Sequence, residues 1–231
     1  MIAFFTKYKR IFFIITAVVF VGSIFFISGQ IFSSSASSAV ADVGGKKIPY
    51  RQFSMQVNRM VSNLRESGTD TNDALVKSVK QEVFRDMVIE ELFSSQAGKM
   101  DMQVPDFEVA VEIQNTPQFR EGQSFSPRLY YQTIFKEFQM SPPEYEAWRK
   151  RARLASKFKQ LIYTTVKVTP KEITAYYLLK NKDLKKFEKE KAKYADELSK
   201  DKFANLANYL LRQLTSQIEI KNYLELREQG R

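Results

Sequence analysis

The chain has 231 residues, 44% of them hydrophobic, which is enough to bury the core of one domain or of two small ones. It contains neither Cys nor His, so disulfides, thiolate nucleophiles and metal sites built on Cys or His are excluded, and the usual general base near neutral pH is missing. Its 36 Lys and Arg outnumber its 26 Asp and Glu, which gives a formal net charge of +10. A Gly-rich phosphate-binding loop is also missing, and we expect neither a cofactor nor a metal.

An uncharged apolar stretch near the N-terminus has the length of a membrane-spanning helix. It covers residues 11–32 and follows Lys7, Lys9 and Arg10. By the positive-inside rule, these basic residues place residues 1–10 in the cytoplasm and everything after the span on the exported side. The sequence therefore predicts a single-pass membrane protein with its bulk exported.

A cleaved signal peptide is the alternative, because Ala39-Val40-Ala41 resembles a signal-peptidase site. The apolar stretch is longer than the hydrophobic region of a usual signal peptide, however, and the site lies well beyond its end. We predict that the anchor is retained and that the Ser- and Ala-rich residues 33–41 form a flexible tether.

The positive charge of the exported part is modest. Three basic residues precede the span, which leaves 33 basic against 26 acidic residues, a net charge of about +7. The excess is spread over helical surfaces, and an exported domain rarely meets nucleic acid, so we expect no nucleic-acid binding. A basic surface of this kind is compatible with the anionic lipid headgroups of the inner membrane.

The exported part begins with a strand signature and two helical patterns. Residues 41–48 read as a short strand around the Gly44-Gly45 pair. Pro49 then opens a helix that ends near residue 68, without the side-chain acceptor of a Ser or Thr cap. Its apolar face consists of Phe53, Val57, Met60, Val61 and Leu64. A polar break separates it from a longer amphipathic helix over residues 73–99.

The best-marked helix begins at Ser141. Residues 141–144, Ser-Pro-Pro-Glu, form a capping box with Pro in the first turn. Apolar residues then recur every three to four positions as far as Ile162, and such a wide apolar face needs a packing partner. A turn-rich loop over residues 116–127 and an amphipathic segment over residues 129–138 precede this helix.

The run TPQFREGQSFSPRLYYQTIFKEFQMSPPEYEAWRKRARLASKFKQLI, residues 116–162, resembles the N-terminal helical domain of the SurA-like and PpiD-like family of periplasmic chaperones. The common pattern is a T-P-x-F turn, a Gly-containing loop followed by F-x-x-x-x-Y, and a capped helix with an aromatic residue and several Arg. This resemblance implies a mainly helical chaperone module over residues 42–231. It also implies a periplasmic location and, as partners, unfolded or translocating polypeptides, inner-membrane lipids and the Sec translocon.

Residues 106–113 give two conflicting signals. Phe107, Val109, Val111 and Ile113 alternate with polar or small residues, which by period alone predicts a strand. The family resemblance implies a helix, and an isolated strand among helices would lack a pairing partner. We therefore predict a helix.

The C-terminal part returns to the beginning of the module. A second capping box, over residues 169–172, opens a helix, and a charged helical stretch continues to Leu214. In SurA-like and PpiD-like chains this region leads into a parvulin prolyl-isomerase domain, and we expect that stretch to take its place in this chain. Residues 218–223 alternate like a strand, and we predict a two-stranded antiparallel sheet with residues 42–48 that joins the chain ends.

No residue stands out for catalysis. The neighbouring carboxylates Glu90-Glu91 and Asp196-Glu197 point in different directions on a helix, and we interpret both pairs as solvated. We therefore predict a non-enzymatic chaperone that holds polypeptides in an apolar groove. The predicted client-binding residues are Phe53, Met60, Tyr130, Tyr131, Phe135, Phe138, Met140, Tyr145 and Trp148, although each such residue is more often core than surface. The alternatives are a scaffold subunit of an envelope complex and a peptidyl-prolyl isomerase relative with residual activity.

Overall fold

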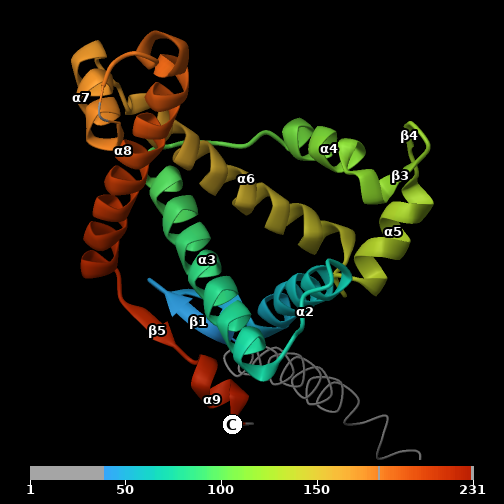
Figure 1. Ribbon diagram of the computed structural model, residues 1–231. Helices are drawn as coiled ribbons and strands as arrows, with labels where there is room; N and C mark the ends of the chain where they lie inside the picture. The colour runs from blue at the N-terminus through green and yellow to red at the C-terminus, as the bar shows by residue number, and fades with distance from the viewer. Residues whose placement is uncertain (1–38, 182, 230–231) are drawn as a thin grey trace, which may run out of the picture.

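The computed structural model describes residues 39–181 and 183–229. Within this range 73% of the residues are helical, and two small antiparallel sheets complete the fold (Figure 1). The mainly helical fold predicted from the sequence is confirmed. The predicted cytoplasmic segment, the anchor and most of the tether lie outside the described residues. Among the helices that are described, none combines the length and the apolar character needed to span a bilayer.

The two ends of the described chain meet in one sheet. Strands β1 (Ala39–Val43), β2 (Lys46–Pro49) and β5 (Ile220–Asn222) pair antiparallel in the order β2-β1-β5. Val43 lies opposite Ile220, so the predicted closure of the module by its own termini is confirmed. The sheet has three strands rather than the predicted two, because Gly44 and Gly45, at φ +59° and +86°, turn the chain back within residues 42–48.

The predicted tether over residues 33–41 is wrong for its last three residues. Ala39, Val40 and Ala41 belong to the central strand of the sheet, and each is at most 1% exposed. Tyr223 N donates a hydrogen bond of 2.9 Å to the Val40 carbonyl oxygen. A Ser- and Ala-rich composition indicates a linker, but small side chains also fit a strand that is covered on both sides. A cut after Ala41 would remove part of this buried strand.

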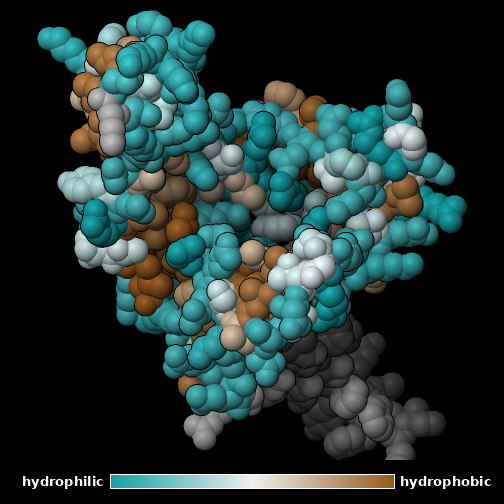
Figure 2. Space-filling model, viewed as in Figure 1, coloured by the Kyte–Doolittle hydropathy of each residue, from teal (hydrophilic) through white to brown (hydrophobic). Residues whose placement is uncertain are grey.

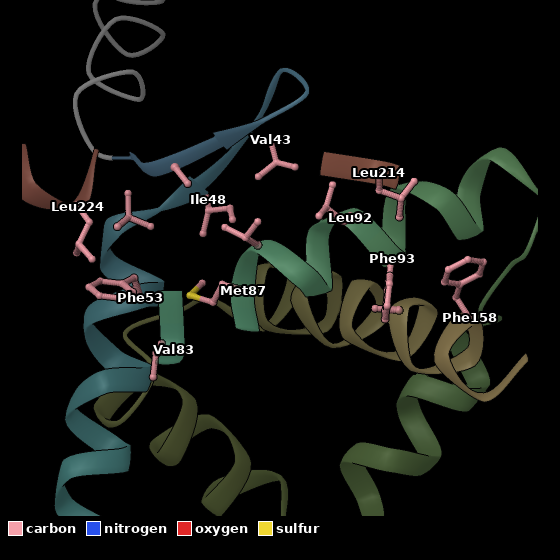
Figure 3. Close-up of a cluster of buried hydrophobic side chains, with 14 of the residues drawn as sticks. Val43, Ile48, Phe53, Val83, Met87, Leu92, Phe93, Phe158, Leu214 and Leu224 are labelled. Atoms are coloured by element: carbon pink, nitrogen blue, oxygen red, sulfur yellow. The ribbon is translucent and has the colours of Figure 1, made fainter. Parts of the chain in front are cut away.

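The main core lies between the sheet and the helices α2 (Tyr50–Glu66), α3 (Asp73–Lys99) and α6 (Pro142–Thr165). Helices α3 and α6 pack along each other more extensively than any other pair. The close-up shows strand residues such as Val43 and Ile48 above α3, which presents Met87 and Leu92 toward them (Figure 3). Phe93 of α3 meets Phe158 of α6 with ring centroids 5.4 Å apart.

Local signals explain where these helices begin. The Asn72 side chain accepts a hydrogen bond of 2.9 Å from Leu75 N at the start of α3. At the start of α6, Ser141 N and Ser141 Oγ both donate to Glu144 Oε2, at 2.7 and 2.8 Å. Helix α2 begins after Pro49 without a side-chain cap, as its sequence predicts.

Residues 106–115 form a helix, α4 (Asp106–Asn115), which confirms the choice made against the alternating pattern. Of the four alternating apolar residues, only Val109 and Ile113 are buried, while Phe107 and Val111 are 68% and 50% exposed. The buried pair is spaced by four residues, the period of a helix face. The predicted loop that follows contains the short helix η1 (Pro117–Phe119) and the hairpin of β3 (Arg120–Glu121) and β4 (Ser124–Phe125), before α5 (Pro127–Lys136).

The long helix α8 (Phe187–Gln217) belongs to two different packing units. Its first half pairs with α7 (Pro170–Lys180) around a separate apolar cluster of Ile173, Tyr177, Phe187 and Tyr194. Its second half packs against α3 and α6, and Leu214 joins the main core. The pair of α7 and the first half of α8 lies at the end of the molecule opposite to the sheet and α9 (Leu224–Glu228) (Figure 1).

Candidate functional site

A cluster of aromatic side chains connects η1, α5 and α6. Phe119 is fully buried, with Tyr130 and Tyr145 edge-on to it at centroid distances of 5.1 and 5.8 Å. Phe138 and Trp148 continue the cluster toward α2, at 5.8 Å from each other. Edge-to-face contacts such as those of Phe119 strengthen packing beyond the area that the rings bury. The cluster therefore fixes the positions of α5 and of the first turns of α6.

An open hollow of about 670 Å³ lies on one side of this cluster, between α4, α5 and α6. We name it the α4–α5–α6 hollow. Its wall is mainly apolar and includes Val109, Ile113, Phe125, Tyr130, Tyr131 and Ala147. Charged groups on the wall are few: Asp106, Glu146 and Lys150. The volume lies in the range of sites that hold a small molecule or several side chains of a peptide.

Ion pairs hold α4, one wall of this hollow, against α6. Glu108 Oε1 is 2.6 Å from Lys157 Nζ, and the hydrogen bond from Lys157 is the main reason why the pKa of Glu108 is lowered. Asp106 pairs with Lys150 at 2.6 Å, and Glu112 pairs with Arg149. These ion pairs add to the apolar attachment of α4, whose buried Val109 and Ile113 pack in the aromatic cluster and also line the hollow.

Tyr130 brings a hydroxyl group to the wall of this hollow. Its hydroxyl donates to Glu146 Oε1 at 3.2 Å, and burial, followed by the charge of Glu146, raises its pKa. The hydroxyl therefore remains protonated at neutral pH and acts as a hydrogen-bond donor. Among the described residues, no group of three or more acidic side chains is close enough together to hold a metal ion. The hollow offers apolar contact surface and a few hydrogen bonds.

A second hollow, of about 550 Å³, lies between α2 and the end of α5. It is more polar, and Met55, Arg59, Phe138 and Trp148 form part of its wall. The Arg59 guanidinium lies 5.4 Å from the centroid of the Phe138 ring, a cation–π arrangement.

A third hollow, of about 640 Å³, lies between α3 and α8. Phe84, Val88 and Leu211 contribute to it, and the space-filling view shows apolar surface gathered where these two helices meet (Figure 2). We name it the α3–α8 hollow.

The predicted client-binding residues fall into three groups: residues that line a hollow, residues that are buried in or packed against an apolar cluster, and the exposed Phe135. Tyr130 and Tyr131 line the α4–α5–α6 hollow, while Phe138 and Trp148 line the second hollow. Tyr145 and Met140 are buried in the aromatic cluster, and Phe53 and Met60 pack in or against the main core. Phe135 is 74% exposed and lies outside these hollows.

Sequence reasoning missed wall residues of the α4–α5–α6 hollow. Val109 and Ile113 were predicted only as part of a helix, yet both reach this wall, as does Phe125 from the loop. The spacing of four residues between Val109 and Ile113 was the available signal. The interpretation of Glu90 and Glu91 as solvated is also wrong: both residues are partly buried, and burial is the main reason why the pKa of Glu90 is raised.

The fold is thus a helical module closed by a sheet that joins the first and last parts of the described chain, with open hollows between the helices. Comparison with protein families gives a match to the SurA-like N-terminal domain over residues 1–159. The chain belongs to this family, a chaperone-type family, as the sequence pattern of residues 116–162 predicts. Helices α7, α8 and α9 and strand β5 lie beyond the matched residues. No curated protein matches the chain.

Proposed function

We propose that this protein is a membrane-anchored periplasmic chaperone that holds segments of unfolded or newly translocated polypeptides in the α4–α5–α6 hollow. The observation that supports this proposal is the hollow itself, which is open, about 670 Å³ in volume and lined mainly by apolar and aromatic side chains. Apolar segments of a client bury surface there and are released without covalent chemistry. Binding is weak and tolerant of sequence, because ordering a flexible client costs much of the interaction free energy.

The proposal includes the location of the protein. The retained anchor over residues 11–32 keeps the module beside the inner membrane, close to chains that leave the Sec translocon, as in PpiD-like proteins. Protease added to intact spheroplasts checks this location. We expect digestion of the exported part and protection of the N-terminal segment, and protection of the whole chain would contradict the proposal.

A blocking substitution tests the hollow. Ala147→Arg places a long charged side chain in the wall of the α4–α5–α6 hollow, at an exposed position on α6 where Arg favours a helix. We expect the full-length variant to bind a urea-unfolded outer-membrane protein about tenfold more weakly, which corresponds to ~1.4 kcal/mol, and to lose most suppression of its aggregation. Light scattering measures the aggregation.

Two matched controls carry the same new side chain. Gln160→Arg introduces it on an exposed part of α6 away from the hollow, and Asn208→Arg introduces it in the wall of the α3–α8 hollow. Both should retain the activity of the unchanged protein. If Asn208→Arg abolishes holding while Ala147→Arg does not, the client site lies between α3 and α8 instead. Co-purification of one folded partner in fixed ratio, with no unfolded chains, would favour a scaffold.

The proposal also holds that the protein is not an enzyme. The expectation rests on the sequence, which has no His for the parvulin type of site. A proline-isomerisation assay on a labelled peptide, with the full-length protein in large excess over a parvulin standard, checks it. Acceleration well above the uncatalysed rate would show residual isomerase activity.

A further inference from the structure

A fourth hollow, of about 430 Å³, differs from the others in its chemistry. It lies where β2 and the start of α2 face α3 and α6, and we name it the β2–α3–α6 hollow. Buried and charged polar groups gather on its wall, together with Met87. The polar members used below are Gln52, Glu90, Glu91, Trp148 and Arg151.

Two polar atoms of this wall are buried without a hydrogen-bond partner. They are Nε1 of Trp148, a side chain that is only 8% exposed, and Oε1 of Glu91. Among the described residues these are the only buried side-chain nitrogen or oxygen atoms in that condition. Lys46 Nζ lies 3.1 Å from Glu91 Oε1 and balances its charge, but the contact lacks the alignment of a hydrogen bond.

An unpaired buried donor or acceptor costs about 1–3 kcal/mol, so a protein that leaves one of each in the same hollow gains when a ligand pairs with them. The donor is an indole N–H, and the acceptor is a carboxylate oxygen. Their complement is a group that presents both an acceptor and a donor. An amide is such a group, because its C=O accepts and its N–H donates.

The charges around the hollow favour a neutral ligand. Glu90 and Glu91 stand on one wall, and Lys46, Lys47 and Arg151 belong to the same hollow. A cation would meet the three basic groups, and an anion would meet the two carboxylates. Gln52, itself 5% exposed, adds a buried carboxamide that can pair with another amide.

We propose that the β2–α3–α6 hollow binds an amide group of the client polypeptide, either in its main chain or in an Asn or Gln side chain. The amide C=O accepts from Trp148 Nε1, and its N–H donates to Glu91 Oε1. This inference rests on the proposed function and adds to it a polar site next to the apolar one. Trp148 also lines the second hollow, so an extended client can contact both places through one side chain.

The chain contains a single Trp, so replacing Trp by an analogue throughout the protein changes Trp148 alone. Growth on benzothienylalanine replaces it by a ring system of nearly the same shape without the N–H. The probe is a fluorescein-labelled peptide of repeating Asn-Ala-Leu, and fluorescence anisotropy with the full-length protein gives its Kd. We expect the replacement to raise the Kd about 3- to 10-fold, the effect of losing one hydrogen bond. The Tm of the free protein should stay the same or rise, because a buried unpaired donor is removed.

A second variant and a control complete the test. Glu91→Met removes the acceptor at nearly the same volume and should also weaken peptide binding. Tyr163→Phe removes the hydroxyl of a 41% exposed Tyr on α6 that lines none of the four hollows, and should leave the Kd unchanged. In the unchanged protein, bound peptide should shift the emission of Trp148.

An unchanged Kd after both replacements, with a lower Tm for the benzothienylalanine protein, would mean that Trp148 Nε1 is satisfied by buried water and would overturn this inference alone. The aggregation assay with unfolded outer-membrane protein separates the two proposals. If suppression and its sensitivity to Ala147→Arg persist, the client-holding function stands without the amide site. If the unchanged protein neither binds the peptide nor suppresses aggregation, the proposed function fails and this inference fails with it.

Discussion

The side chain of Glu172 connects the start of α7 to α8. Its Oε2 accepts from Thr169 N and Thr169 Oγ1, at 2.7 and 3.0 Å, while its Oε1 accepts from Lys202 Nζ at 2.5 Å. The cap of α7 is thus joined to the middle of α8. The hydrogen bond from Lys202, followed by those from Thr169, lowers the pKa of Glu172 to about 2.

The pH dependence of stability follows from this lowered pKa. A carboxyl whose pKa is lower in the folded state stabilises the fold above its unfolded pKa, near 4.5, and loses this effect as the pH falls toward 2. We expect Glu172→Gln to lower the Tm at pH 7 and to have little effect near pH 2. Thermal unfolding between pH 2 and pH 7 measures the difference.

Glu90→Gln should act in the opposite direction. The pKa of Glu90 is raised, chiefly by burial, so its charged form destabilises the fold near neutral pH. The Gln variant should therefore be more stable than the unchanged protein at pH 7. The advantage should disappear at a pH low enough to protonate Glu90. If Glu90→Gln and Glu172→Gln changed the Tm in the same way at every pH, the opposite pKa shifts of the two carboxyl groups would be contradicted.

At the scale of elements, the turn between β1 and β2 decides how the sheet is built. Gly44 and Gly45 both have positive φ, and Asp42 Oδ1 accepts from Gly45 N at 2.8 Å. Gly44 N also donates to the Glu219 carbonyl oxygen at 2.9 Å, which links the turn to the approach of β5. The turn therefore sets the pairing on both sides of β1.

Replacing the two glycines should have graded effects. In Gly44→Ala the new Cβ would lie 3.0 Å from Ile218 Cγ2 at a φ of +59°, and we expect a loss of about 2 kcal/mol. In Gly45→Ala the new Cβ would meet no atom within 4 Å. We expect this variant to lose only about 1 kcal/mol of stability, the cost of holding Ala at a positive φ. Gly98→Ala, in α3, is the control and should gain about 0.5–1 kcal/mol. Urea unfolding gives the three values, and equal losses at both turn positions would contradict a role for Ile218.

At the scale of the whole molecule, α7 and the first half of α8 are separate from the main core. Their apolar cluster shares no buried residue with the clusters around α3 and α6. Helix α8 runs continuously from one unit to the other, and the short segment between α6 and α7 also connects them. We expect the two units to differ in local stability.

Ile173→Ala tests this difference. Ile173 is 7% exposed, and its truncation should cost about 2–4 kcal/mol. Hydrogen exchange should then speed up in α7 and in the first half of α8, while α3 and α6 stay protected. Leu179→Ala, at an 84% exposed position of the same helix, should change exchange little. A uniform loss of protection over the whole molecule would show that the units unfold together.

Much of the architecture could be predicted because its signals are local. The capping residues at Ser141 and Thr169 mark their helices, and the alternation after Ile218 marks the returning strand. A lone strand cannot satisfy its backbone hydrogen bonds, and for this reason residues 218–223 were predicted to pair with residues 42–48. The sequence pattern of residues 116–162 was specific enough to indicate the family that the comparison then showed.

The sites depended on the tertiary structure. No local sequence pattern shows that residues 39–41 are buried in a strand, because the same small residues also occur in flexible linkers. Nor does sequence decide that Tyr131 lines a hollow while Phe53, an aromatic on a similar helix face, fills the core. Adjacent Glu90 and Glu91 could equally have faced solvent. Periodicity fixes which face of a helix is apolar, whereas the packing of α2, α4 and α5 around α6 determines which part of that face stays open.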